Sequence, residues 1–61
     1  MNFKNIPSWA EEYDFIVCYK NEEENCWEYW SVESREIGVK TQCNLIRSKG
    51  LKPLVVEVLD F

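Results

Sequence analysis

Alternating hydrophobic and polar positions predict two strands joined by a short turn in the first half of the chain. From Tyr13 to Lys20, every second side chain falls on the same side of a strand, and both sides carry apolar groups, as in a central strand. The stretch from Cys26 to Val32 alternates in the same way. Residues 20–25 hold neighbouring carboxylates that need water, so they predict a turn and the two strands form a hairpin. One face of the second strand is expected to carry Trp27, Tyr29 and Ser31, and the other Cys26, Glu28, Trp30 and Val32.

A short helical turn is predicted before the hairpin and a further strand at the end of the sequence. Pro7 precedes Ser8, and Glu11 follows three residues after Ser8, which is the spacing of a capping box. Ser8 is therefore expected to cap about one turn of helix. Residues 53–61 alternate again and predict the last strand, which runs from Pro53 to Phe61.

The region after the hairpin predicts one longer helix. Ser31 or Ser34 is expected to cap this helix, and Gly50 to stop it. Gly38 disfavours a helix by about 1 kcal/mol relative to Ala, so the regular helix is expected to begin near Val39. The apolar positions that recur at helical spacing are Val39, Cys43 and Ile46, widened by Leu45.

Together these elements predict a single small α+β domain over residues 1–61. The order is a helical turn followed by β-β-α-β, with a three-stranded, mainly antiparallel sheet in the strand order 2-1-3 and one helix on one face. Nothing in the sequence is expected to cover the other face, so we expect it to be buried by a second copy in a homodimer. The residues expected in that dimer interface are Tyr13, Phe15, Tyr29, Val55 and Phe61.

The composition is that of a folded domain with a small interior. The 61 residues are 46% hydrophobic and 15% aromatic, which argues against disorder. The start of the sequence has no apolar leader segment, and the most apolar run, residues 54–56, is interrupted by Glu57. We therefore expect a cytoplasmic protein with no contact to a membrane.

The residues that support most enzyme and metal chemistry are missing. The chain has no histidine, which excludes nucleophilic constellations that rely on a Cys–His or Ser–His pair. Cys18, Cys26 and Cys43 have neither metal-ligand spacing nor the spacing of a disulfide framework, so we expect free, buried thiols. The sequence thus predicts a non-enzymatic protein with no catalytic residues, no metal and no cofactor.

Charge is distributed unevenly along the chain, whose net charge is −4. Nine of the eleven acidic residues lie within residues 1–36, and five of the seven basic residues lie within residues 35–52. The acidic hairpin would repel a phosphate backbone, which argues against nucleic-acid binding. The alternative that stays open is a nucleic-acid-binding or regulatory domain that uses the basic side of the helix, with Lys40, Arg47, Lys49 and Lys52.

The hairpin turn combines acidic and aromatic residues in a way that indicates a protein-binding surface. Trp and Tyr dominate binding hot spots, and carboxylates at the rim steer an electropositive partner. The predicted partner-binding residues are Glu22, Glu23, Glu24, Trp27 and Tyr29. The alternative is that the acids only keep the turn soluble and the aromatic residues serve the dimer.

The motif Ile6-Pro7-Ser8-Trp9-Ala10-Glu11, together with Trp27-Glu28-Tyr29-Trp30, resembles short acidic proteins of bacteriophages and mobile elements. That class includes small inhibitors of host defence, which block or sequester a host protein, often as dimers. The resemblance implies a protein-binding module, such as a phage-type inhibitor of a host protein, that acts as a small homodimer. It assigns no functional residue.

Overall fold

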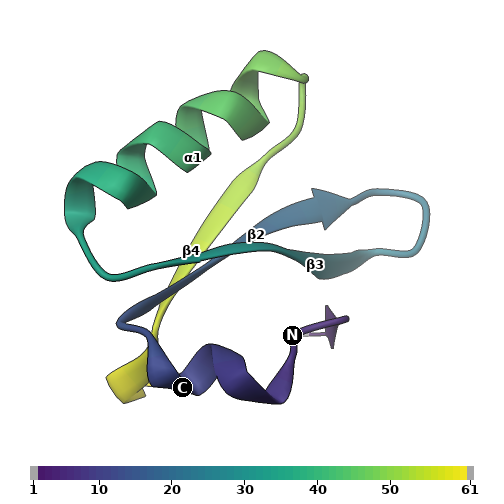
Figure 1. Cartoon of the computed structure of the whole chain (residues 1–61). Helices are drawn as coiled ribbons and strands as arrows, with labels where there is room; N and C mark the ends of the chain where they lie inside the picture. Colours follow the sequence, from purple (N-terminus) through teal and green to yellow (C-terminus); the bar gives the residue numbers. More distant parts are fainter. Residues whose placement is uncertain (1, 61) are drawn as a thin grey trace.

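The computed structural model describes residues 2–60, apart from the side chain of Asp60. Two helical segments lie on opposite sides of a sheet (Figure 1). The elements in chain order are β1 (Phe3–Lys4), the 3-10 helix η1 (Ser8–Glu12), β2 (Phe15–Asn21), β3 (Cys26–Glu33), α1 (Glu36–Ser48), β4 (Pro53–Glu57) and the 3-10 helix η2 (Val58–Asp60).

The sheet has four strands in the order β1-β3-β2-β4 and mixed direction. Strand β2 pairs antiparallel with β3 and with β4, whereas β1 runs parallel to β3, with Phe3 opposite Trp27. The molecule is α+β with one α-helix among the described residues. The predicted three-stranded sheet of order 2-1-3 is wrong, because β1 adds a strand and a parallel pairing. Two residues are too few to show alternation, so no local pattern predicts β1.

One face of the sheet packs against α1. Cys43 and Ile46 of the helix are buried against Val17 of β2. Trp30 also lies on this side, where its indole Nε1 donates a hydrogen bond of 2.8 Å to Oε1 of Gln42. Because a buried indole N–H needs an acceptor, this bond fixes α1 over β3.

The N-terminal segment covers the opposite face. Ala10 of η1 is fully buried against Ile16 and Cys18, and Phe3 and Ile6 pack around them. Figure 1 shows η1 on the side of the sheet away from α1. The expectation that nothing in the chain covers this face is therefore wrong, since residues 3–10 supply the second apolar layer.

A β-bulge in β3 changes which side chains share a face. Val17 lies opposite Ser31 but Cys18 lies opposite Tyr29, so Trp30 is the extra residue. As a result Trp30 packs in the cluster under α1, while Val32 packs in the cluster under η1. The predicted grouping of Trp30 with Val32 is wrong, because strict alternation does not allow for the bulge.

Both helix starts differ from the prediction. Helix η1 follows Pro7, and no side chain caps it, so the predicted capping box at Ser8 does not form. Helix α1 begins at Glu36, earlier than the expected start near Val39, and the residue before it, Arg35, makes no side-chain cap.

The end of α1 forms a Schellman motif around Gly50, as the position of this glycine suggested. The Gly50 amide bonds the Arg47 carbonyl at 2.9 Å, and the Leu51 amide bonds the Ile46 carbonyl at 3.2 Å. Gly50 has a φ of 76°, which favours glycine. Helix α1 has 13 residues. No helix within residues 2–60 is long and apolar enough to span a membrane.

Candidate functional site

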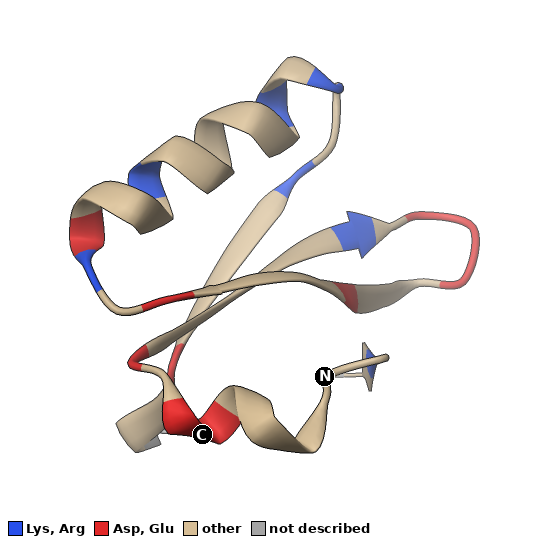
Figure 2. Cartoon of the chain, viewed as in Figure 1, with Lys and Arg blue, Asp and Glu red and all other residues tan. Residues whose placement is uncertain are grey.

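The predicted acidic turn lies at one end of the β2–β3 hairpin. Glu22, Glu23 and Glu24 are all exposed there, and Figure 2 shows this red turn projecting from the sheet. Asn25 closes the turn with a φ of 52°, a conformation that Asn adopts more readily than most residues. The turn chemistry therefore presents the carboxylates to solvent.

Glu24 is engaged within the molecule. Its Oε1 accepts a bond of 2.6 Å from Nζ of Lys4, and its Oε2 accepts one of 3.2 Å from Nδ2 of Asn21. The hydrogen bond to Glu24 and the charge of this carboxylate raise the pKa of Lys4 above its ordinary value. Glu24 thus ties β1 to the turn, which leaves Glu22 and Glu23 as the carboxylates of the turn that make no ion pair with the described residues.

Glu28 is the most highly hydrogen-bonded carboxylate in the described chain. Its Oε2 accepts bonds from Nδ2 of Asn21 at 2.6 Å and from the Tyr19 hydroxyl at 3.3 Å, and its Oε1 accepts one from Nδ2 of Asn5 at 3.0 Å. The bond from Asn21 does most to lower the pKa of Glu28 below its ordinary value, and partial burial opposes it. Glu28 therefore links the N-terminal segment to β2.

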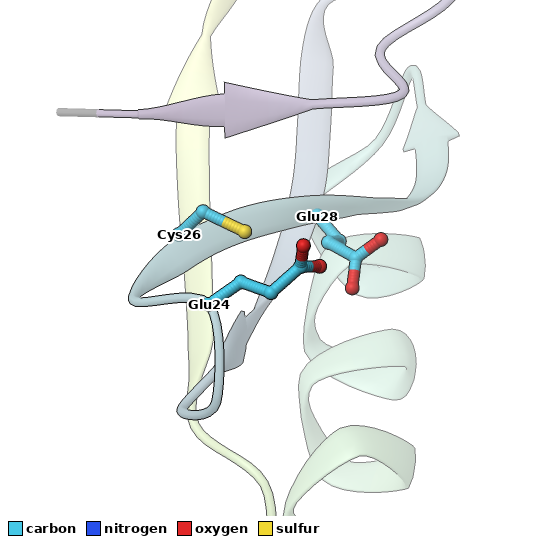
Figure 3. A group of neighbouring side chains, drawn as sticks. All are labelled: Glu24, Cys26 and Glu28. Atoms are coloured by element: carbon cyan, nitrogen blue, oxygen red, sulfur yellow. The ribbon is translucent and has the colours of Figure 1, made fainter.

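Glu24, Cys26 and Glu28 place possible metal ligands within 4.8 Å of one another (Figure 3). Both carboxylates already accept bonds from protein donors, and the Lys4 ammonium is one of them. The Cys26 side chain is buried. A cation would have to displace Lys4, Asn5 and Asn21 from these carboxylates. The cluster therefore serves to hold the N-terminal segment, β2 and β3 together.

The predicted aromatic anchors lie on the face that η1 covers. Trp27 and Tyr29 are half-buried there and pack around the Ala10 cluster. Nζ of Lys20 lies 5.1 Å from the centroid of the Trp27 ring, and Tyr29 meets Trp9 edge-on at 6.1 Å between centroids. Trp27 still lies beside the turn, where it lines a hollow with Asn25, whereas Tyr29 packs against Trp9 of η1.

The residues predicted for a dimer interface are dispersed. Tyr29 belongs to the cluster under η1, whereas Val55 belongs to the cluster under α1. Phe15 is half-buried and Tyr13 is exposed before β2, while Phe61 lies outside the described residues. Tyr29 and Val55 therefore lie on opposite faces of the sheet.

A hollow of about 490 Å³ lies at the other end of the sheet, where η1, α1 and η2 meet. Five acidic residues and four apolar ones line it, with Ser34, and no Lys or Arg is among its lining within residues 2–60. Figure 2 shows acidic residues around η1 and the start of α1, away from the hairpin turn. The residues that line it include Glu11, Glu12, Tyr13, Glu36, Glu57 and Leu59.

Large apolar side chains are exposed around this hollow. Leu59 is 98% exposed and Tyr13 40% exposed, and both line it. Trp9 is 48% exposed and packs edge-on against Tyr13, and a neighbouring hollow that shares Tyr13 includes Ile37, which is 74% exposed. Exposed apolar side chains beside several carboxylates have the composition of a protein-binding patch.

Comparisons with protein-family models, with curated proteins and with solved structures found no match. The site must be interpreted from its own geometry.

The described thiols do not add a reactive centre. All three cysteines are buried and free, and burial raises the pKa of the Cys18 thiol to about 11. A thiol with so high a pKa is a poor nucleophile at neutral pH. The sequence has no histidine that could act as a base toward these thiols.

Sequence reasoning missed the hollow and its acidic lining. Residues 11–15, Ser34, Glu36 and residues 57–59 form it, and they come from separate segments of the chain that only the fold brings together. Leu59 gave no signal either, because the alternation predicted it inside the last strand, whereas it lies in η2 after β4 has ended.

Proposed function

We propose that this chain is a non-catalytic protein-binding module that docks an electropositive partner at the acidic hollow, the surface lined by Glu11, Glu12, Tyr13, Glu36, Glu57 and Leu59. The observation that carries the proposal is the combination of these carboxylates with exposed apolar side chains and without lining Lys or Arg in the described chain. A neutral or anionic partner would leave the carboxylates uncompensated.

The two kinds of residue have separate roles in this binding. Leu59 and Tyr13 supply apolar area that a partner removes from water, at about 25 cal/mol per Å² buried. The carboxylates steer a basic surface toward the hollow and make association faster at low salt. The resemblance to phage inhibitors favours a basic host protein as the partner, and the cytosol as the place of binding.

Two charge-matched variants test the position of the site. Glu12→Gln/Glu57→Gln removes two charges from the hollow, and Glu22→Gln/Glu23→Gln removes two from the turn. Each tagged protein is used to capture partners from a lysate of the cells in which the protein occurs, with quantitative mass spectrometry. We expect the hollow variant to capture at least about tenfold less of a basic protein that the turn variant still captures. A tenfold loss corresponds to about 1.4 kcal/mol of binding free energy.

Leu59→Ala provides a test that does not change the charge. Because Leu59 is almost fully exposed, the substitution should leave folding intact and weaken capture of the same protein. Capture that depends on Glu22 and Glu23 instead would assign the site to the turn. Equal capture by all variants would refute both positions.

The second candidate is nucleic-acid binding on the outer side of α1. Lys40 and Arg47 are exposed on this helix and Lys49 follows it, and Figure 2 shows these basic residues along and just beyond α1. Labelled DNA and RNA in a mobility-shift assay at about 0.15 M salt distinguish the two functions. We expect no shift, and a shift that Lys40→Gln/Arg47→Gln abolishes would favour the second candidate.

A further inference from the structure

Strand β4 is an edge strand whose outer side is unpaired in the described chain. It pairs with β2 only, at the end of the order β1-β3-β2-β4. The Lys52 carbonyl accepts a bond from Lys20 at 2.9 Å, and the Val58 amide donates one to Asp14 at 3.0 Å. The direction of the backbone N–H and C=O groups alternates along a strand. The backbone groups of Leu54 and Val56 therefore point toward β2, as those of Lys52 and Val58 do, and the backbone groups of residues 53, 55 and 57 point outward.

From this pattern we infer that β4 pairs with β4 of a second copy of this chain, antiparallel and with Val55 opposite its equivalent. In this register the two Val55 residues exchange both of their backbone hydrogen bonds. Each Glu57 amide then meets the carbonyl of the other copy's Pro53. Both outward N–H groups of β4 are satisfied in each copy.

The position of proline fits this register. Pro53 has no N–H to donate, and in the symmetric ladder it is required only as an acceptor. On the side chains, Leu54 of one copy falls opposite Val56 of the other, and Val55 lies beside Val55. Apolar and β-branched pairs across antiparallel strands each contribute about 0.2–1 kcal/mol relative to alanine pairs.

The rest of the fold leaves this edge accessible. Helix α1 contacts β2, β3 and β4, so it lies over the middle of the sheet. The other edge, β1, has two residues and is too short for an equivalent ladder. Pairing through β4 would join two four-stranded sheets into one and add the core that a 61-residue chain lacks.

Hydrogen exchange of the native protein tests this pairing without any substitution. In the dimer the Val55 and Glu57 amides are bonded, and in the monomer they face solvent. We expect their exchange to slow by at least about tenfold as the protein concentration rises from about 10 µM to about 1 mM. Light scattering over this range should approach twice the chain mass of 7.3 kDa. A monomer at all these concentrations would overturn the inference.

Proline substitutions locate the interface. Val55→Pro and Glu57→Pro each remove an outward N–H, which the monomer does not use and which edge strands can lack. We expect both variants to be monomeric, and Glu57→Gln, which keeps the N–H, to dimerise. If Val55→Pro does not fold, Glu57→Pro and its matched control decide. Dimers of both proline variants, or fast exchange at Val55 and Glu57 in a dimer, would place the interface elsewhere and refute the pairing through β4.

Discussion

At the scale of single residues, Glu28 connects parts of the chain that are far apart in sequence. Its carboxylate accepts hydrogen bonds from Asn5, beyond β1, and from Tyr19 and Asn21 in β2. These bonds favour the ionised form and lower its pKa in the folded state. Protonation therefore weakens the attachment of the N-terminal segment to the sheet.

The pKa of Glu28 predicts how stability depends on pH. The pKa of Glu28 in the folded state is below the ordinary value of 4.5. Its contribution to the free energy of unfolding is therefore complete above that pH and is lost as the pH falls through the folded pKa. Glu28→Gln, which lacks this titration, should show a shallower loss of thermal stability below about pH 4.5 than the wild type. Melting curves by circular dichroism between about pH 6 and pH 3 measure it.

Tyr19→Phe is the matched control, because it removes one of the three donors to Glu28 and keeps the carboxylate. The loss of its thermal stability at acid pH should lie between that of the wild type and that of Glu28→Gln. Identical profiles for all three proteins would show that Glu28 does not link folding to pH.

Residue identity alone predicted some of these roles and not others. The sequence indicated that residues 22–24 are exposed on a turn, since three neighbouring carboxylates need water, and they are exposed. It did not indicate that Lys4 would bind Glu24, because that pair depends on β1 lying beside β3. Long-range partners of this kind leave no trace in local spacing.

At the scale of elements, a glycine inside α1 and a glycine just beyond its C-terminal end have opposite requirements. Gly38 lies inside the helix, where the flexible carboxylate of Glu33 is the nearest obstacle to an added Cβ. Gly50 lies in open space, but its positive φ strains any side chain. The same substitution should therefore have opposite effects at the two positions.

Gly38→Ala should stabilise the protein by about 0.5–1 kcal/mol, because alanine is the better helix former and Glu33 can rotate away. Gly50→Ala should destabilise it by about 1 kcal/mol, since a non-glycine residue is unfavourable in the left-handed region. Urea unfolding followed by tryptophan fluorescence gives both values. A loss of stability in Gly38→Ala would mean that Glu33 is held in place.

The elements that the sequence predicted best are those with many repeats of one period. Strands β2 and β3, the helix after them and the stop at Gly50 were recognisable, since alternation and helical spacing extend over several residues. The bulge at Trp30 was not, because one extra residue in a ladder has no signal in a single sequence. Strand β1 was missed because it exists only through its pairing with β3.

At the scale of the whole molecule, folding gathers negative charge at one end. Glu12 and Glu57 are distant in sequence and line the same hollow. Glu22 and Glu23 are adjacent in the chain, so their repulsion is present in the unfolded state as well. Repulsion between Glu12 and Glu57 arises only in the folded state, so it opposes folding, whereas repulsion between Glu22 and Glu23 is similar in both states.

Neutralising the hollow should therefore stabilise the protein while it weakens partner binding. At low salt, we expect Glu12→Gln/Glu57→Gln to be more stable than the wild type by about 0.2–1 kcal/mol. Its melting temperature should also change less than that of the wild type when salt is added. Glu22→Gln/Glu23→Gln, with the same net charge, should gain less. Thermal melts at about 10 mM and about 500 mM NaCl make the comparison, and equal gains in the two variants would contradict it.

The strand order also determines when the sheet can be completed during synthesis. Strand β2 is central, and its neighbour on one side, β3, follows it closely in the chain, whereas its other neighbour, β4, is separated from it by the whole of α1. A nascent chain that has emerged from the ribosome as far as the end of α1 can form the β2–β3 hairpin while the other edge of β2 is still open. That edge strand includes the β-branched residues Ile16 and Val17, and unpaired strands of this kind invite pairing with other chains. Ribosomes that translate this message close together would therefore expose several such edges to one another until residues 53–57 emerge and pair with β2.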